Sequence, residues 1–117
     1  MNTLSVRIFE TPEAVVIKLE GDAGLRAADG LQAPFARIKE ARPARVVFDL
    51  AGLRFAASLF LGLLVDLRKG IVYQGGRLQL AAVQPNIREL LHVTGLEELF
   101  EFIAEAPAEQ ASAAAIA

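Results

Sequence analysis

The segment ARVVFDL, residues 44–50, constrains the fold of this chain more than any other part of the sequence. Apart from Arg45, all of its residues up to the aspartate are apolar, and it includes two adjacent valines. Such a run is typical of a strand that is covered on both faces, as the inner strands of parallel sheets are. We therefore expect residues 44–50 to form a central strand, and the rest of the chain must supply its covering layers and its neighbours.

Two segments with alternating polarity precede this strand and predict a hairpin. Residues 4–10 read LSVRIFE and residues 14–20 read AVVIKLE, and in each of them apolar residues recur at every second position. Only Thr11, Pro12 and Glu13 separate the two segments. So short a link can join only antiparallel neighbours, because parallel strands need a crossover of about a dozen residues or more.

Helical patterns flank the central strand. Small and polar residues at 21–30 predict a loop, and helical spacing then begins near Leu31, with Pro34 tolerated in the first turn. Residues 51–57, AGLRFAA, predict a short link after the central strand. A second helix is expected over 58–73, because Gln74-Gly75-Gly76 supplies a stop signal. Its predicted core stripe consists of Phe60, Leu63, Leu64, Leu67 and Ile71.

The last third of the chain repeats the alternation of strand and helix. RLQLAAV, residues 77–83, predicts a strand, and the segment from Pro85 to Gly95 predicts a helix. Residues 96–105 fit either a short helix or an edge strand. We therefore expect a single α/β domain over residues 1–103, with a mixed sheet that begins with an antiparallel hairpin and has helices packed against it. The alanine-rich residues 104–117 predict a flexible tail.

Composition excludes several classes of function. The net charge is −2, with 12 basic and 14 acidic residues, so the concentrated basic surface that binds nucleic acid is absent. Without cysteine there is neither a disulfide nor a sulfur-ligated metal site, which fits a cytoplasmic protein. The densest apolar stretch, 59–65, is far shorter than the ~20 residues that cross a bilayer. We expect no secretory signal and no membrane partner.

The sequence offers little chemistry. His92 is the single histidine, and its position on a predicted helix indicates a structural role. Gly75-Gly76 precedes a strand and is interpreted as a turn, since a phosphate-binding loop would open a helix. Neither a catalytic residue, a metal site nor a cofactor is predicted, so the chain is expected to act by binding and not as an enzyme. The acidic residues interpreted as a solvated surface are Glu97, Glu98, Glu101 and Glu105.

Ser58 is the one serine in the interior of the chain, at the predicted start of the second helix. One interpretation is a helix cap, whose hydroxyl accepts a hydrogen bond from an early helical N–H. The other is a phosphorylation switch, because a helix N-terminus tolerates a phosphate while an apolar binding surface does not. Both interpretations use the same geometry, and the residues alone leave them open.

The string VVFDLAGLRFAASLFLGLL, residues 46–64, resembles the signature of the STAS domains, the anti-sigma factor antagonists. That signature has an aspartate, a leucine and a glycine, then a second aspartate, two hydroxyl residues and a closing glycine. The resemblance covers about residues 3–103, including the hairpin and the segment GGRLQLAAVQPNIRELLHVTGLEELF. It implies a module that binds an anti-sigma factor, often itself a serine kinase, and that phosphorylation releases from its partner.

The resemblance places the phosphorylated serine at Ser58. Three residues depart from the signature: Ala57 stands for the second aspartate, Leu59 for a hydroxyl residue and Phe60 for a small glycine. The surface that the resemblance implies for partner binding consists of Asp49, Gly52, Ala57, Ser58, Leu59, Phe60, Leu61 and Gly62.

Two functions follow from this resemblance. The first is an anti-sigma factor antagonist that docks an anti-sigma factor or serine-kinase-like regulator through residues 51–57 and the start of the second helix, with Ser58 as the control point. The second is a degenerate scaffold or oligomerisation subunit that binds constitutively, without phosphorylation, through Leu59, Phe60 and their apolar neighbours. A homodimer is one form of the second.

Overall fold

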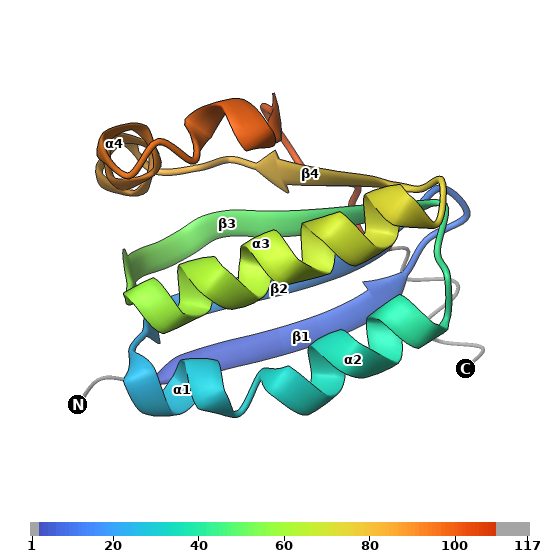
Figure 1. Ribbon diagram of the computed structural model, residues 1–117, viewed down its shortest axis with the longest axis horizontal. Coiled ribbons are helices and arrows are strands. Elements are labelled where there is room, and N and C mark those ends of the chain that lie inside the picture. The colour runs from blue at the N-terminus through green and yellow to red at the C-terminus, as the bar shows by residue number, and fades with distance from the viewer. Residues whose placement is uncertain (1–2, 110–117) are drawn as a thin grey trace.

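A five-stranded sheet forms the centre of the computed structural model, which describes residues 3–109. The strands lie in chain order, β1-β2-β3-β4-β5; β1 and β2 are antiparallel and every other pair is parallel (Figure 1). The mixed sheet that begins with a hairpin is thus confirmed. The strands are β1 Leu4–Glu10, β2 Val15–Ala23, β3 Arg45–Ala56, β4 Arg77–Ala81 and β5 Glu101–Ile103.

Helices cover one face of this sheet. Figure 1 shows α1, α2 and α3 in front of the strands, and α4 beyond the arrowhead of β4. Side chains from these helices and from the facing side of the sheet form the main core. The helices are α1 Leu25–Asp29, α2 Gln32–Glu40, α3 Ser58–Tyr73, α4 Pro85–Val93 and the 3-10 helix η1 Glu97–Leu99.

β3 is the central strand that its sequence predicts. Val46, Val47 and Phe48 are fully buried, which requires cover on both faces because successive side chains alternate across the sheet. Val46 and Phe48 lie in the core under the helices. The ring of Phe48 meets Phe35 of α2 edge to face, with centroids 5.5 Å apart.

A smaller cluster covers the other face of the sheet. Val16, Val47 and Ala81 are fully buried there, and Ala106 packs against them. Arg7 of β1 forms an ion pair with Glu109. Residues 104–109, the start of the predicted tail, therefore cross the face that the helices leave open. The remainder of that tail, 110–117, lies outside the described residues.

The loop predicted over 21–30 is wrong. β2 continues to Ala23, and Leu25–Asp29 form α1, a helix of five residues that is too short to show periodicity in the sequence. The strand continues because β3 extends beside it and the N–H of Ala57 donates to the carbonyl of Ala23, at 2.8 Å. Pairing across the sheet overrides the local preference of small and polar residues for a turn.

The link predicted over 51–57 is wrong for the same reason. Residues up to Ala56 belong to β3 and pair with β2. The pairing shifts register twice, between Lys18 and Glu20 and between Gly21 and Asp22, and at each shift β3 has one residue more than β2. Such bulges bend a strand and let it continue through a segment that lacks regular alternation.

The later elements agree with the sequence more closely. α3 has the predicted bounds, but its core stripe differs from the predicted one. Leu61 is buried, whereas Leu63, which we expected in the core, is only half-buried. α4 begins at Pro85 as predicted, and β4 ends two residues before the predicted end. For residues 96–105 the sequence fits either a short helix or an edge strand. Both occur, because the short helix η1 is followed by the edge strand β5.

The two phenylalanines of β3 give a matched test of this core. We expect Phe48→Ala to lower the free energy of unfolding by about 3–5 kcal/mol, because it removes a ring that the core surrounds completely. Phe55→Ala, on the same strand, should cost less than about 1 kcal/mol, because the Phe55 side chain is 53% exposed. Urea unfolding followed by circular dichroism measures both, and equal losses would contradict the described core.

Candidate functional site

Ser58 is the first residue of α3, and its side chain is exposed. The N-cap position belongs to Ala57, whose carbonyl accepts the first helical hydrogen bond, from Leu61 N–H at 3.2 Å. The helix has no side-chain capping hydrogen bond. The interpretation of Ser58 as a cap is therefore wrong, because the pairing of Ala57 with β2 moves the cap one residue back from the serine.

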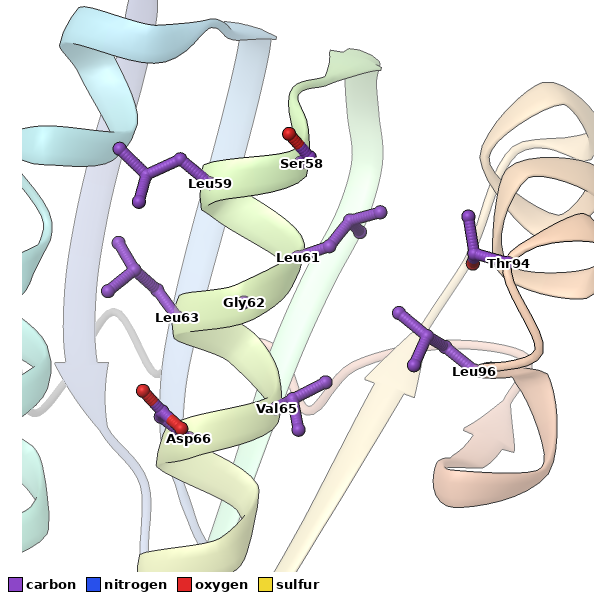
Figure 2. Close-up of a pocket in the computed structure, with 9 residues that line it drawn as sticks. All are labelled: Ser58, Leu59, Leu61, Gly62, Leu63, Val65, Asp66, Thr94 and Leu96. Atoms are coloured by element: carbon purple, nitrogen blue, oxygen red, sulfur yellow. The ribbon is translucent and has the colours of Figure 1, made fainter.

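Ser58 lies at the mouth of an open groove beside α3. The groove has a volume of about 710 Å³ (Figure 2). Its floor and near wall come from α3, and its far wall comes from the turn between α4 and η1. The lining residues are Ser58, Leu59, Leu61, Gly62, Leu63, Val65, Asp66, Thr94 and Leu96.

The side chains of α3 divide into two rows with a bare strip between them. Leu61 and Val65 point across the groove toward Leu96, whereas Leu59 and Leu63 point to the opposite side of the helix (Figure 2). Gly62 lies between the rows and is exposed. A Cβ atom at Gly62 would meet no other atom within 4 Å, so no neighbour within the fold requires glycine there.

A charged cluster holds the far wall of the groove in place. Glu97 of η1 accepts a hydrogen bond from Nε of Arg88 at 2.6 Å and lies 3.1 Å from Nδ1 of His92. The guanidinium of Arg88 also stacks on the ring of Phe102, 3.7 Å from its centroid. The hydrogen bond from Arg88, followed by that from His92, lowers the pKa of Glu97. The cluster thereby ties the turn that carries Leu96 to α4.

The groove is lined mainly by apolar side chains. Asp66 is the one charged residue among those that line it. His92 is not among the residues that line the groove, and its Nδ1 lies 3.1 Å from Oε1 of Glu97. Within residues 3–109 there is no cluster of three or more metal-ligating side chains, and none of the helices described there is long and apolar enough to cross a membrane. An apolar groove of this kind can contact apolar side chains of another protein.

The structure brings together only part of the predicted surface. Ser58, Leu59, Leu61 and Gly62 line the groove, and Ala57 adjoins it. Phe60, which we expected to contact a partner, is 1% exposed and packs in the core. Its burial leaves no side-chain surface for docking, because on α3 it faces the sheet.

Asp49 and Gly52 also lie away from the groove. Asp49 pairs in register with Lys18 and Ala81, so its side chain lies on the face of the sheet that the helices do not cover. There its carboxylate accepts a hydrogen bond from the N–H of Ala51, at 3.1 Å. At Gly52 a Cβ atom would lie 2.7 Å from Cγ of Glu20. Both residues thus lie within the bulged part of β3 and outside the groove.

Five lining residues were not part of the predicted surface. Leu63 was assigned to the core, and Val65 and Asp66 follow one helical turn further along α3. A signal for these three was present, because residues three and four apart share a helix face. No such signal exists for the far wall, whose approach to α3 depends on how α4 packs. The residues concerned are Leu63, Val65, Asp66, Thr94 and Leu96.

Known proteins share both sequence and fold with this chain. Residues 6–103 match the family described as "Mlab, STAS domain". An anti-sigma factor antagonist from Mycobacterium paratuberculosis aligns with a TM-score of 0.77 at 20% identity, over 97% of this chain and 94% of that one. A STAS domain protein from Planctomyces limnophilus aligns with 0.74 at 25% identity, over 96% and 97%.

A third solved structure is described as the Bacillus cell fate determinant SpoIIAA in its phosphorylated form. It aligns with a TM-score of 0.68 at 20% identity, over 96% of this chain and 98% of that one. At such identities the likeness shows a common fold. The family match, which spans most of the described residues, rests on the sequence itself.

The charged cluster at Glu97 predicts a dependence of stability on pH. A carboxylate whose pKa is lowered in the folded state stabilises the fold above its unfolded pKa, and that contribution is lost as the pH falls through the lowered value. We therefore expect wild type to melt at a higher temperature than Glu97→Gln at neutral pH, and the difference to vanish well below the ordinary value of 4.5. Thermal unfolding over a pH series measures it. Glu98→Gln, an exposed neighbour on η1, is the control, and an equal pH dependence for it would contradict the assignment.

Proposed function

Because this chain belongs to the STAS domain family, we propose that it is a regulatory, non-enzymatic module that binds a partner protein through the groove beside α3. The proposed partner is an anti-sigma factor or a serine-kinase-like regulator in the cytoplasm. Phosphorylation of Ser58 would end the interaction. The family membership supports the regulatory role, and the partner and the switch are the parts to be tested.

The observation that carries this proposal is the position of the Ser58 hydroxyl. It is exposed, it is not used as a cap, and it lies where an apolar groove meets the first turn of a helix. A kinase can reach such a hydroxyl without unfolding the domain. A modification there would add its charge at the end of the groove formed by the first turn of α3.

The physics of a phosphate at this position favours a switch that leaves the fold intact. The first N–H groups of α3 have no helical acceptor, and the helix dipole attracts a negative charge by about 0.3–1 kcal/mol. A partner that covers the groove would instead have to bury close to two negative charges against apolar side chains. The penalty therefore falls on binding and not on folding.

Related proteins support this proposal without fixing the partner. Structures that share the fold are described as anti-sigma factor antagonists, and one of them was solved in both unphosphorylated and phosphorylated forms. Those descriptions concern other proteins at 20–23% identity.

A second candidate is constitutive binding through the same groove. The observation that favours it is Ala57, which places a methyl group where the family signature has a carboxylate, directly before Ser58. Leu59 is half-buried against the core and adds no second hydroxyl. In this version the groove binds its partner, and Ser58 is an unmodified residue at its border.

Substitution of Ser58 distinguishes the two candidates. We expect Ser58→Asp to weaken partner binding about tenfold or more, which corresponds to about 1.4 kcal/mol, while the melting temperature stays the same or rises slightly. A pull-down from native lysate with the wild-type chain identifies the partner, and titration of the purified partner then measures the affinity.

Ser58→Asn is the matched control, because it has nearly the size of aspartate and no charge. Binding as tight as wild type by Asn and weakened binding by Asp support the switch. Equal affinity for Asn and Asp would remove the switch and leave constitutive docking as the function.

Gly62 gives an independent test of the groove. Glycine in a helix interior costs about 1 kcal/mol relative to alanine, and a Cβ at Gly62 would meet no atom of the fold. We expect Gly62→Ala to raise the free energy of unfolding by up to about 1 kcal/mol and to weaken partner binding, because the new methyl group lies in the contact.

Gly70→Ala is the control for that variant. Gly70 belongs to the same helix, but its Cβ would meet the Lys39 side chain of α2 and lies outside the groove. We expect it to leave partner binding unchanged. Unaltered binding by Gly62→Ala would show that the partner does not cover this part of α3.

A further inference from the structure

The free edge of β1 is a second surface, and it shares no residue with the groove. β1 is the first strand of the sheet and pairs only with β2. We propose that β1 also pairs with β1 of a second copy of this chain. The two strands would run antiparallel about a two-fold axis at Val6, so that two five-stranded sheets become continuous.

The exposed apolar side chains of β1 support this proposal. Val6 and Ile8 are 40% and 44% exposed, although they face the same side of the sheet as Ile17 and Leu19, which are fully buried. The helices thus cover these side chains of β2 completely and those of β1 only in part. An added strand would cover this apolar row and pair the outer N–H and C=O groups of β1 at the same time.

β1 lacks the features by which edge strands usually avoid such pairing. Natural edges carry lysines, prolines or bulges, and they are often very short. β1 has seven residues, contains neither lysine nor proline, and pairs with β2 without a register shift. Its one cation, Arg7, points to the opposite face and is bound to Glu109. Among residues 3–109, no further backbone segment hydrogen-bonds to this edge.

Among the registers that pair at least five residues of β1, one makes its sequence self-complementary. Directly opposed residues must face the same side of a sheet, so the two-fold axis must coincide with a residue. An axis at Arg7 would oppose two guanidinium groups, and an axis at Ile8 would oppose Val6 to a glutamate. An axis at Val6 opposes Val6 to Val6, Leu4 to Ile8 and Ser5 to Arg7. It therefore aligns apolar with apolar residues and leaves no like charges opposed.

A groove beside β1 fits this register. It lies between β1 and α2, has a volume of about 460 Å³, and is lined on one side by Ile8 and on the other by Pro34, Ile38 and Ala41. With the axis at Val6, Leu4 of the second copy lies directly beside Ile8 at the mouth of this groove. Two-fold symmetry fills the equivalent groove of the second copy in the same way.

Cysteine cross-linking tests both the dimer and its register, because the chain has no cysteine of its own. In Val6→Cys the two cysteines would be directly opposed, with Cα atoms about 4.5–5.5 Å apart, which suits a disulfide. In Ile8→Cys they would be offset by four residues, roughly 13 Å along the strand. We expect a disulfide-linked dimer for Val6→Cys on mild oxidation, and little for Ile8→Cys or for Val72→Cys, an exposed valine on α3.

Sedimentation of the unmodified chain gives the second measurement. We expect a monomer–dimer equilibrium that Val6→Lys abolishes, because two lysines would meet at the axis, while Val93→Lys, an exposed valine on α4, leaves it intact. Unchanged melting temperatures would confirm that both lysine variants fold. A chain that stays monomeric at every concentration, or equal cross-linking at positions 6, 8 and 72, would overturn the proposal. Occupation of the edge by residues 110–117 would give that monomeric result.

Discussion

The pairing of β2 with the far end of β3 determines where the site lies. The hydrogen bond from the Ala57 N–H to the Ala23 carbonyl extends the contact between the two strands one residue past Ala56, the last residue of β3. Helix α3 must then begin at Ser58, with the hydroxyl already beyond the cap and exposed to solvent. A single backbone contact thus converts a residue suited to capping into one that is accessible for modification.

Much of the fold could be predicted from the sequence, because the signals concerned are local. Continuous apolar residues identified the central strand, and alternation with a short link identified the hairpin. The two glycines after residue 74 identified the end of α3. The failures, α1 and the extension of β3, concern segments whose conformation is set by a neighbouring strand. A helix of five residues has no period to detect, and a bulge has no regular alternation.

The candidate site was predictable only along α3. Ser58, Leu59, Leu61 and Gly62 follow one another in the chain, so a linear motif could gather them. Asp49 belongs to the same motif, but the pleat of β3 directs it to the opposite face of the sheet, and only the register with its neighbours decides that. The far wall comes from a turn more than thirty residues away in the sequence, positioned by the contacts of Glu97 with α4.

The order of the strands has a consequence for how the domain folds. Each strand lies beside the strand that precedes it in the chain. The sheet can therefore form by adding one strand after another in chain order, without pairing to a segment that is distant in the sequence. Contacts between segments close in sequence are formed at a lower loop-closure cost, and they favour rapid folding. A growing chain on the ribosome could therefore complete the hairpin and its first helices before α4 and β5 have been synthesised.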